Sequence, residues 1–135
     1  MPKVNAALLL IRIAAAAAFI YHGSAILFGA FGGPGPQKFA AFIHVPVVLG
    51  YLVGLGQFLG GLALLFGIFT RIAAAVLAVI MLGAIFLVHL PHGFDIGKGG
   101  SEYAFAQLCI SLALLLAGPG VYSIASRLSS PIGKL

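Results

Sequence analysis

The chain has 135 residues, of which 62% are hydrophobic and only 7% are charged. Soluble domains are closer to half apolar and a quarter charged, so this composition excludes an ordinary soluble protein. Its mean hydropathy is +1.21, and it contains several apolar runs of about 18 residues or more. We therefore predict a small integral membrane protein, with one domain over residues 1–135 and no separate soluble domain.

The net charge of +5 comes from basic residues that are scattered singly along the chain. Because they form no cluster or stripe, they do not indicate nucleic-acid binding and instead fit charges that set topology at membrane boundaries. The single cysteine, Cys109, excludes an intramolecular disulfide and a dithiol redox pair within this chain.

The first predicted span covers residues 4–28 and follows Pro2. Its apolar run is too long for a signal-peptide core and no cleavage site follows it, so we expect the segment to be retained. Arg12 lies about eight residues into this span, roughly 12 Å along a helix. A charge at that depth is costly unless the side chain snorkels to the headgroups or finds a partner. By depth, the candidate partner is Gln57.

The segment 29–46 is rich in glycine and proline but also contains Phe39, Phe42 and Ile43. These apolar side chains predict an interfacial helix that lies on the bilayer rather than a flexible linker.

The second predicted span covers residues 47–69. Counting by threes and fours places Gln57 on the same helical face as Gly50, Gly54 and Gly61. Since small residues let helices approach closely, this face predicts a helix–helix seam with Gln57 turned into the bundle. Gln57 could then serve a ligand site, or only form an interhelical hydrogen bond that orients the packing.

The third and fourth predicted spans cover residues 71–89 and 102–117, the fourth being short. The tight turn Phe69–Arg71 forces the second and third spans to be antiparallel neighbours. A glycine-rich loop, residues 90–101, connects the third span to the fourth. We therefore predict an all-α fold, an integral membrane four-helix bundle. The chain has no convincing internal repeat, so an inverted-repeat transporter is not indicated.

The fourth span begins with Glu102, whose carboxylate suits a helix N-terminus. Small residues, Ala106, Cys109 and Ala113, follow it on the same helical row. We expect Cys109 to be a buried packing residue.

Orientation follows from the basic residues in the connections. The prediction is a cytoplasmic-membrane protein with both termini in the cytoplasm, because more basic residues fall on the side of the termini. That side holds Lys3, Arg71, Arg127 and Lys134, and the other side holds Lys38 and Lys98.

Ionisable side chains gather at the predicted outer ends of the spans, where His22, His89, His92 and Glu102 lie. Histidines there could hydrogen-bond or pass protons to a quinone head group, ligate a haem axially, or simply pack at the interface. Their spacing does not fit a metal site, so no metal is expected. The candidate ligand-binding residues are therefore Arg12, His22, Gln57, His89, His92, Glu102 and Tyr103; no catalytic residue is assigned.

Short motifs run in a fixed order through nearly the whole chain. They are Arg12, Tyr21-His22-Gly23, Phe31-Gly32-Gly33-Pro34-Gly35, Gly60-Gly61, Gly67-Ile68-Phe69-Thr70-Arg71, Val88-His89-Leu90-Pro91-His92-Gly93-Phe94 and Glu102-Tyr103. With this set of motifs the chain resembles proteins of the DoxX family, including DoxD-like proteins described as quinone-linked oxidoreductase subunits.

The resemblance implies a four-helix membrane bundle and a role linked to quinol oxidation, thiosulfate:quinone chemistry or oxidative and thiol stress. Other relatives are parts of membrane redox complexes, and an animal relative is a receptor-assembly chaperone, so the family does not fix an activity. Many similar members carry a glutamate where Gln57 stands. Glutamine cannot transfer a proton as a carboxylate does, although it retains hydrogen bonding.

The sequence therefore favours a membrane subunit of a quinone-linked redox system that binds a quinone-like or small amphipathic ligand in the outer half of the bundle. The chain lacks flavin, nucleotide and iron–sulfur signatures, so we expect no intrinsic cofactor, with haem as an alternative. Expected partners are the lipid bilayer, membrane or peripheral redox proteins, and a second copy of the chain. The alternative function is a non-catalytic scaffold or assembly factor for partner membrane proteins.

Overall fold

The computed structural model describes residues 1–128 and 131–135. These residues form helices, turns and irregular segments without strands, which confirms the all-α prediction. The α-helices are α1 (Pro2–Phe28), α2 (Gly35–Phe42), α3 (Val47–Phe66), α4 (Thr70–Ala84) and α5 (Glu102–Ala117). A π-helical turn, Ile85–His89, and a 3-10 turn, Leu90–His92, extend α4. Further 3-10 turns cover Ala30–Gly32, Ile96–Lys98, Ala125–Arg127 and Pro131–Lys134.

Proline and glycine residues set the ends of the long helices. Pro2 is the first residue of α1, where its missing N–H costs no helical hydrogen bond. α3 ends at Phe66 rather than at the predicted Phe69, because Gly67 adopts a left-handed conformation (φ 67°) and its N–H bonds to the carbonyl of Ala63.

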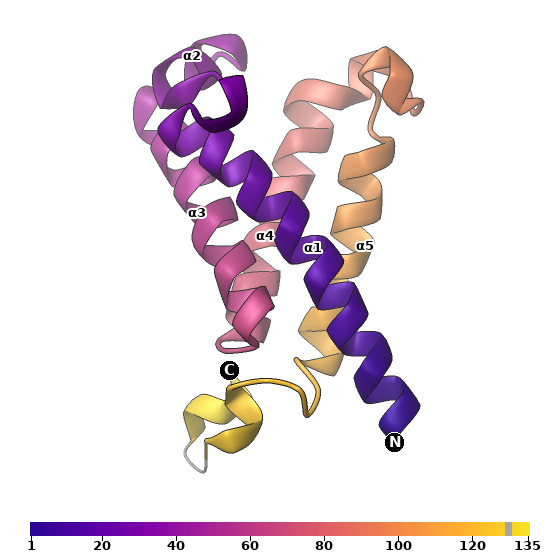
Figure 1. Ribbon diagram of the computed structural model, residues 1–135. Coiled ribbons are helices and arrows are strands. Elements are labelled where there is room, and N and C mark those ends of the chain that lie inside the picture. The colour runs from indigo at the N-terminus through magenta and orange to yellow at the C-terminus, as the bar shows by residue number, and fades with distance from the viewer. Residues whose placement is uncertain (129–130) are drawn as a thin grey trace.

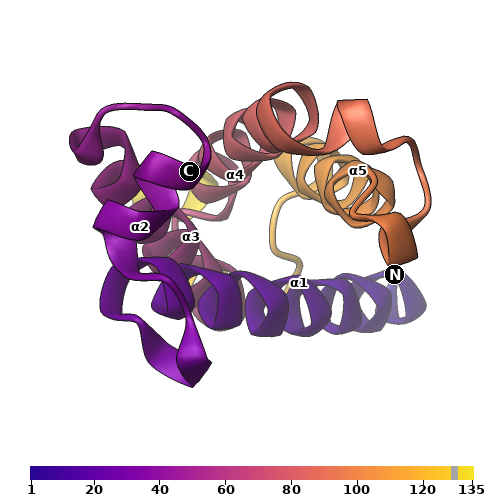
Figure 2. The ribbon, with the colours of Figure 1, turned by 90° about the horizontal axis from the view of Figure 1, so that it is seen from above.

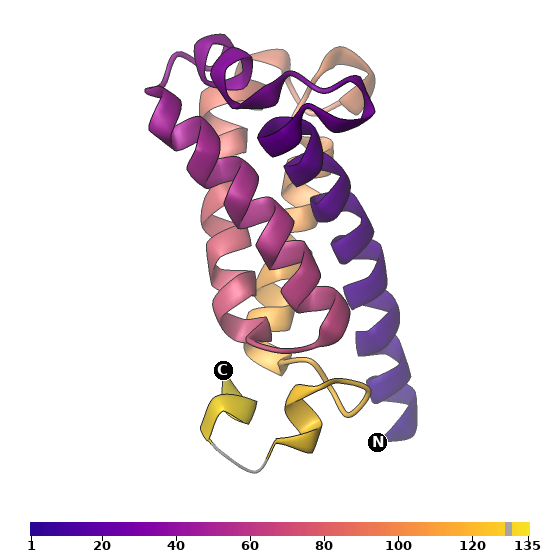
Figure 3. The same cartoon turned by 60° about the vertical axis from the view of Figure 1, so that its left-hand side comes forward.

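The long helices pack in the order α1, α3, α4, α5, as the view from above shows (Figure 2). α1 contacts mainly α3, and α4 contacts both α3 and α5. Both chain termini lie at one end of the molecule, which we call the terminal end (Figure 1). The opposite end, which we call the loop end, carries α2 and residues 85–101 (Figures 1 and 3).

α2 supports the prediction of a helix in the segment 29–46. It lies across the loop end against α3 and α1 (Figure 3). Pro36 and Ala40 form its buried face, and they pack against Gly50 of α3. The side chain of Phe42 is exposed.

Three helical segments are long and apolar enough to cross a membrane, judged by length and composition. They are Pro2–Phe28, Val47–Phe66 and Thr70–His92. α5 is apolar but has only 16 residues. The structure therefore supports a multi-pass membrane protein with three spans by this criterion, and α5 is considered below.

The predicted glycine seam is present between α1 and α3. A Cβ atom added to Gly54 would lie 3.0 Å from Ile26 Cγ2, and one added to Gly61 would lie 2.9 Å from the backbone nitrogen of Ile20. Gln57 shares this face and is only 6% exposed. The close helix approach thus requires the glycines and turns Gln57 inward, as the sequence predicted.

We expect Gly61→Ala to lower the free energy of unfolding by about 1–3 kcal/mol, because the added methyl group overlaps the α1 backbone. The matched control is Gly83→Ala in α4, where an added Cβ meets no atom within 4 Å. That change should be neutral or stabilise by up to roughly 1 kcal/mol. Chemical unfolding of both variants in detergent checks this, and equal midpoints would contradict the seam.

Candidate functional site

A cavity of about 690 Å³ opens at the loop end, beneath α2 and between the α1–α3 pair and the α4–α5 pair. Figure 1 shows that these two helix pairs diverge toward this end. Most of the lining is aliphatic or aromatic. The polar side chains in it are His22, Gln57, His89 and Tyr103.

Each of these polar side chains comes from a different helical element. His22 lies near the end of α1, Gln57 in the middle of α3, and Tyr103 in the first turn of α5. His89 ends the π-helical turn that follows α4. Such a turn widens the helix and often occurs at functional sites. Here it places His89 in the lining together with its neighbours Leu87 and Val88.

The imidazole of His89 is held by the backbone of the glycine-rich loop. Its Nδ1 lies 2.8 Å from the carbonyl oxygen of Gly99. A carbonyl only accepts hydrogen bonds, so this contact assigns the proton to Nδ1 and leaves Nε2 with a lone pair in the neutral ring. His89 therefore offers an oriented acceptor.

His22 and Tyr103 join α1 to α5 at the cavity. Their ring centroids are 5.2 Å apart and the rings are tilted by 53°. Tyr21 packs edge-on against His22 from the other side, at 5.2 Å and 89°. The hydroxyl of Tyr103 is buried and has no hydrogen-bond partner among the described residues.

Gln57 is the polar side chain that α3 contributes to the cavity lining. Its side chain makes no hydrogen bond within residues 1–128 and 131–135, although the residue is buried. The amide therefore has donors and an acceptor available for a molecule in the cavity.

Arg12 does not belong to this cavity, and its predicted pairing with Gln57 is wrong. The guanidinium donates to four backbone carbonyls, those of Leu64 (2.8 Å), Leu65 (3.0 Å), Pro119 (3.1 Å) and Tyr122 (2.7 Å). α3 runs antiparallel to α1, so the level of Arg12 meets the last turn of α3, about two helical turns beyond Gln57. Snorkelling is also wrong, since Arg12 is only 1% exposed.

The carbonyls that Arg12 binds include orphan acceptors at the C-terminus of α3, where the helix dipole favours a cation. Gly67 makes room for it, because a Cβ there would lie 2.9 Å from Arg12 Cζ. Arg71 binds the C-terminus of α5 in the same way. It donates to the carbonyls of Leu115 (3.2 Å) and Leu116 (3.5 Å) in the last turn of that helix. Both arginines therefore stabilise helix ends.

We expect Arg12→Lys to lower the free energy of unfolding by roughly 2–4 kcal/mol, since an ammonium cannot reproduce the fork of donors and each bond to a charged group contributes about 1.5–3 kcal/mol. The control is Arg127→Lys, an exposed arginine in the C-terminal segment. Denaturant unfolding in detergent measures both. If Arg12→Lys lowered the free energy of unfolding no more than Arg127→Lys does, the carbonyl cluster would not need a guanidinium.

Glu102 and His92 lie outside the cavity lining. Glu102 Oε1 accepts from the backbone N–H of Ile96 at 3.1 Å, and Asp95 Oδ1 accepts from that of Gly97 at 2.9 Å. The two carboxylates therefore shape the glycine-rich loop that carries Gly99 to His89. Among the described residues, no group of three or more His, Cys, Asp or Glu side chains is placed to hold a metal ion.

The expectation that Cys109 is buried is wrong, because Cys109 is exposed. The whole row Glu102, Ala106, Cys109 and Ala113 faces outward. α5 instead turns a different face to the core, formed by Ala104, Gln107, Ser111 and Leu114.

The family model DoxX matches residues 7–90. The chain belongs to the DoxX family. It is 30% identical over 110 residues to "Putative oxidoreductase CatD" of Bacillus subtilis (strain 168), covering 82% of this chain and 78% of that protein. It is 38% identical over 97 residues to "Inner membrane protein YqjF" of Escherichia coli (strain K12), covering 69% and 72%. No solved structure matches significantly.

These matches confirm the family resemblance and support a multi-pass membrane protein. The DoxX match spans His22, Gln57 and His89 but ends before α5, which supplies Tyr103. The cavity therefore combines side chains from the DoxX-matched region with one from the helix that follows it.

The sequence interpretation missed two polar residues in this DoxX chain. Gln107 and Ser111 follow Tyr103 at intervals of four on the inner face of α5. Gln107 Oε1 and Ser111 Oγ are buried without a hydrogen-bond partner in the described part of the chain, as is Thr70 Oγ1 on α4. Their spacing of four from Tyr103 is the sequence signal that places them on this face, and the row containing Glu102 and Cys109 lies on the outward face.

We expect Ser111→Ala to leave the free energy of unfolding unchanged or to raise it slightly, because a buried hydroxyl without a partner pays only desolvation. Ser123→Ala is the matched control. Its Oγ donates to the Gly120 carbonyl at 2.7 Å and accepts from the Ser126 N–H at 3.2 Å, so its loss should cost about 1 kcal/mol. Thermal unfolding measures both; a larger loss for Ser111→Ala would mean that its hydroxyl is paired.

Proposed function

We propose that the chain is a cytoplasmic-membrane subunit of a quinone-linked redox system, and that it binds a quinone-like molecule in the loop-end cavity. The observation that carries this proposal is the meeting of His22, Gln57, His89 and Tyr103 within an otherwise apolar cavity. A volume of about 690 Å³ lies within the range of small-molecule sites. The relative named as an oxidoreductase supports a redox role.

The polar groups suit the two ends of a quinone ring. A quinone carbonyl only accepts hydrogen bonds, and the Gln57 amide and the Tyr103 hydroxyl supply donors that no described residue occupies. After reduction, a quinol hydroxyl donates, and the free Nε2 of His89 is an acceptor. The same cavity can therefore satisfy the oxidised and the reduced ring.

The chain itself would bind rather than carry electrons, since its sequence lacks flavin, nucleotide and iron–sulfur signatures. A membrane or peripheral redox partner would supply them. Haem between His22 and His89 is the alternative occupant, and a Soret band in the purified protein would favour it over quinone.

The proposal includes a four-helix membrane bundle with α5 as the fourth span. α5 packs along α4 and is tied to its first turn by Arg71. Its 16 residues correspond to about 24 Å of helix, so it would cross a thinned part of a core of about 30 Å. Lys3, Arg71, Arg127 and Lys134 all belong to the terminal end, which we therefore place in the cytoplasm.

Calorimetric titration of purified protein with a short-chain benzoquinone tests the site. We expect His89→Ala and Gln57→Leu each to weaken binding about tenfold, a change of about 1.4 kcal/mol per site. His92→Ala is the matched control, because His92 is close in sequence but outside the cavity lining. If both cavity variants bound the benzoquinone as tightly as the unaltered protein, the cavity would not be the quinone site.

A scaffold or assembly factor is the second candidate function. It is favoured by the outward row of Ala106, Cys109 and Ala113 on α5, since small residues are common where membrane helices meet. A pure scaffold needs no quinone, so the same titration would give no binding to the unaltered protein.

A further inference from the structure

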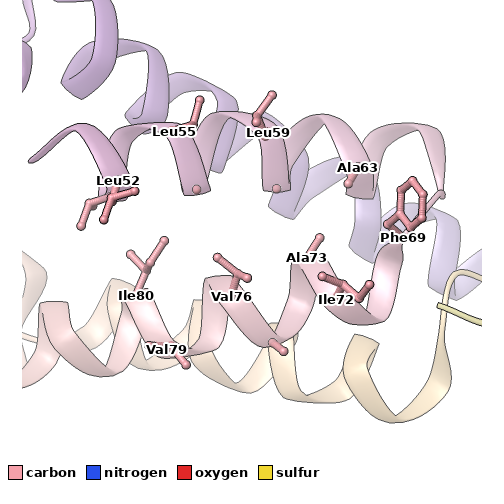
Figure 4. A pocket seen from close by; sticks show the side chains of 14 residues that line it. Leu52, Leu55, Leu59, Ala63, Phe69, Ile72, Ala73, Val76, Val79 and Ile80 are labelled. Carbon is pink, nitrogen blue, oxygen red and sulfur yellow. The ribbon is translucent and has the colours of Figure 1, made fainter. Parts of the chain in front are cut away.

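A second depression lies on the side of the molecule, between α3 and α4. It is a groove of about 820 Å³ whose lining is almost entirely apolar. Figure 4 shows Ile80, Val76 and Ala73 of α4 pointing toward α3 across it. Nothing in the polar chemistry described so far uses this groove.

The groove lies next to the polar cavity. Val53 on α3 and Val79 and Ile80 on α4 line both of them. These three apolar side chains form the boundary between the cavity that contains Gln57 and the groove that opens sideways. A molecule whose head occupied the cavity would thus have an apolar path leading out between the two helices.

The groove is poorly suited to a second transmembrane helix. Gly56 and Gly60 have the spacing of a helix-docking pair. However, a Cβ on Gly56 would lie 2.8 Å from Ile80 Cδ1, and one on Gly60 would lie 3.0 Å from Leu77 Cγ. The glycines are therefore already used by α4 of the same chain, and the remaining space suits a thin, flexible chain.

The length of the groove fits a hydrocarbon tail. Its lining on α3 extends from Leu52 to Ala63, which corresponds to roughly 16 Å of helix. Phe69 lies at the far end, near the turn between α3 and α4 (Figure 4). A chain of several isoprene units could lie along this length with its head in the cavity.

We propose that this groove binds the isoprenoid tail of the ligand, and that the natural ligand is therefore a long-chain membrane quinone rather than a tailless one. Val53, Val79 and Ile80 form the portal between head site and tail site. This inference rests on the proposed function, because it assumes that the quinone head occupies the cavity.

The test compares a tailless benzoquinone with a homologue carrying a long isoprenoid tail, both competing with a labelled short-chain quinone in the same detergent. The variant is Val76→Phe, which fills the groove and leaves the cavity lining intact. The matched control is Val48→Phe, an exposed position on α3 outside both depressions. We expect the tailed quinone to lose at least tenfold in affinity in Val76→Phe only, and the tailless one to be unaffected in either variant.

Equal loss of both quinones in Val76→Phe, or no loss of either, would overturn the tail assignment without contradicting the proposed head site. Failure of the tailless quinone to bind the unaltered protein would instead remove the proposed function. Displacement of the tailed quinone by an excess of diacyl phospholipid, with the tailless one retained, would identify a lipid groove and also overturn the proposal.

A second measurement covers the case in which Val76→Phe does not fold. A quinone with a photoreactive group at the end of its tail is cross-linked to the unaltered protein, and the labelled peptide is identified. We expect label between residues 59 and 76, and label confined to α1 or α5 would contradict the groove.

Discussion

The structure depends on the hydrogen bonds that one buried arginine, Arg12, makes to backbone carbonyls. Arg12 brings a full positive charge into the apolar interior, and its four hydrogen bonds all go to backbone carbonyls. Two of these belong to the last turn of α3 and two to the segment after α5. One side chain on α1 thereby fixes the ends of two other elements, and Arg71 adds a parallel attachment between α4 and the end of α5. The terminal end is consequently the best-anchored part of the molecule.

This anchoring explains where a cavity can form. The helix pairs are tied together at the terminal end and diverge toward the loop end (Figure 1). There α2 packs on α3 and α1 and contributes Phe39 and Phe42 to the cavity lining. The glycine seam keeps α1 against α3 at the level of Gly54 and Gly61. Gln57 faces that space from the seam, while His89 and Tyr103 reach it from the opposite pair.

Local patterns in the sequence were enough to predict the helices, the seam and the inward direction of Gln57, because glycine spacing and apolar runs act within one helix. The pairing of Arg12 could not be predicted by depth, because its acceptors are main-chain carbonyls that carry no side-chain signal. Two of them lie in the C-terminal segment, more than 100 positions away in sequence. Cys109 was misplaced for a related reason. Small residues suit both a buried face and an outward one, and only the buried Gln107 and Ser111 show which face α5 turns inward.

The hydrogen bonds of Arg12 do not depend on the protonation of any acidic or histidine side chain. Arginine stays protonated in proteins, and peptide carbonyls do not titrate, so these bonds persist at any pH at which the chain is folded. An ion pair with a carboxylate would have lacked this property. Both acidic side chains, Asp95 and Glu102, lie at the loop end instead and shape the segment that carries Gly99 to His89. The acceptors that Arg12 binds at the terminal end are therefore main-chain groups, whereas acidic side chains shape the loop at the mouth of the cavity.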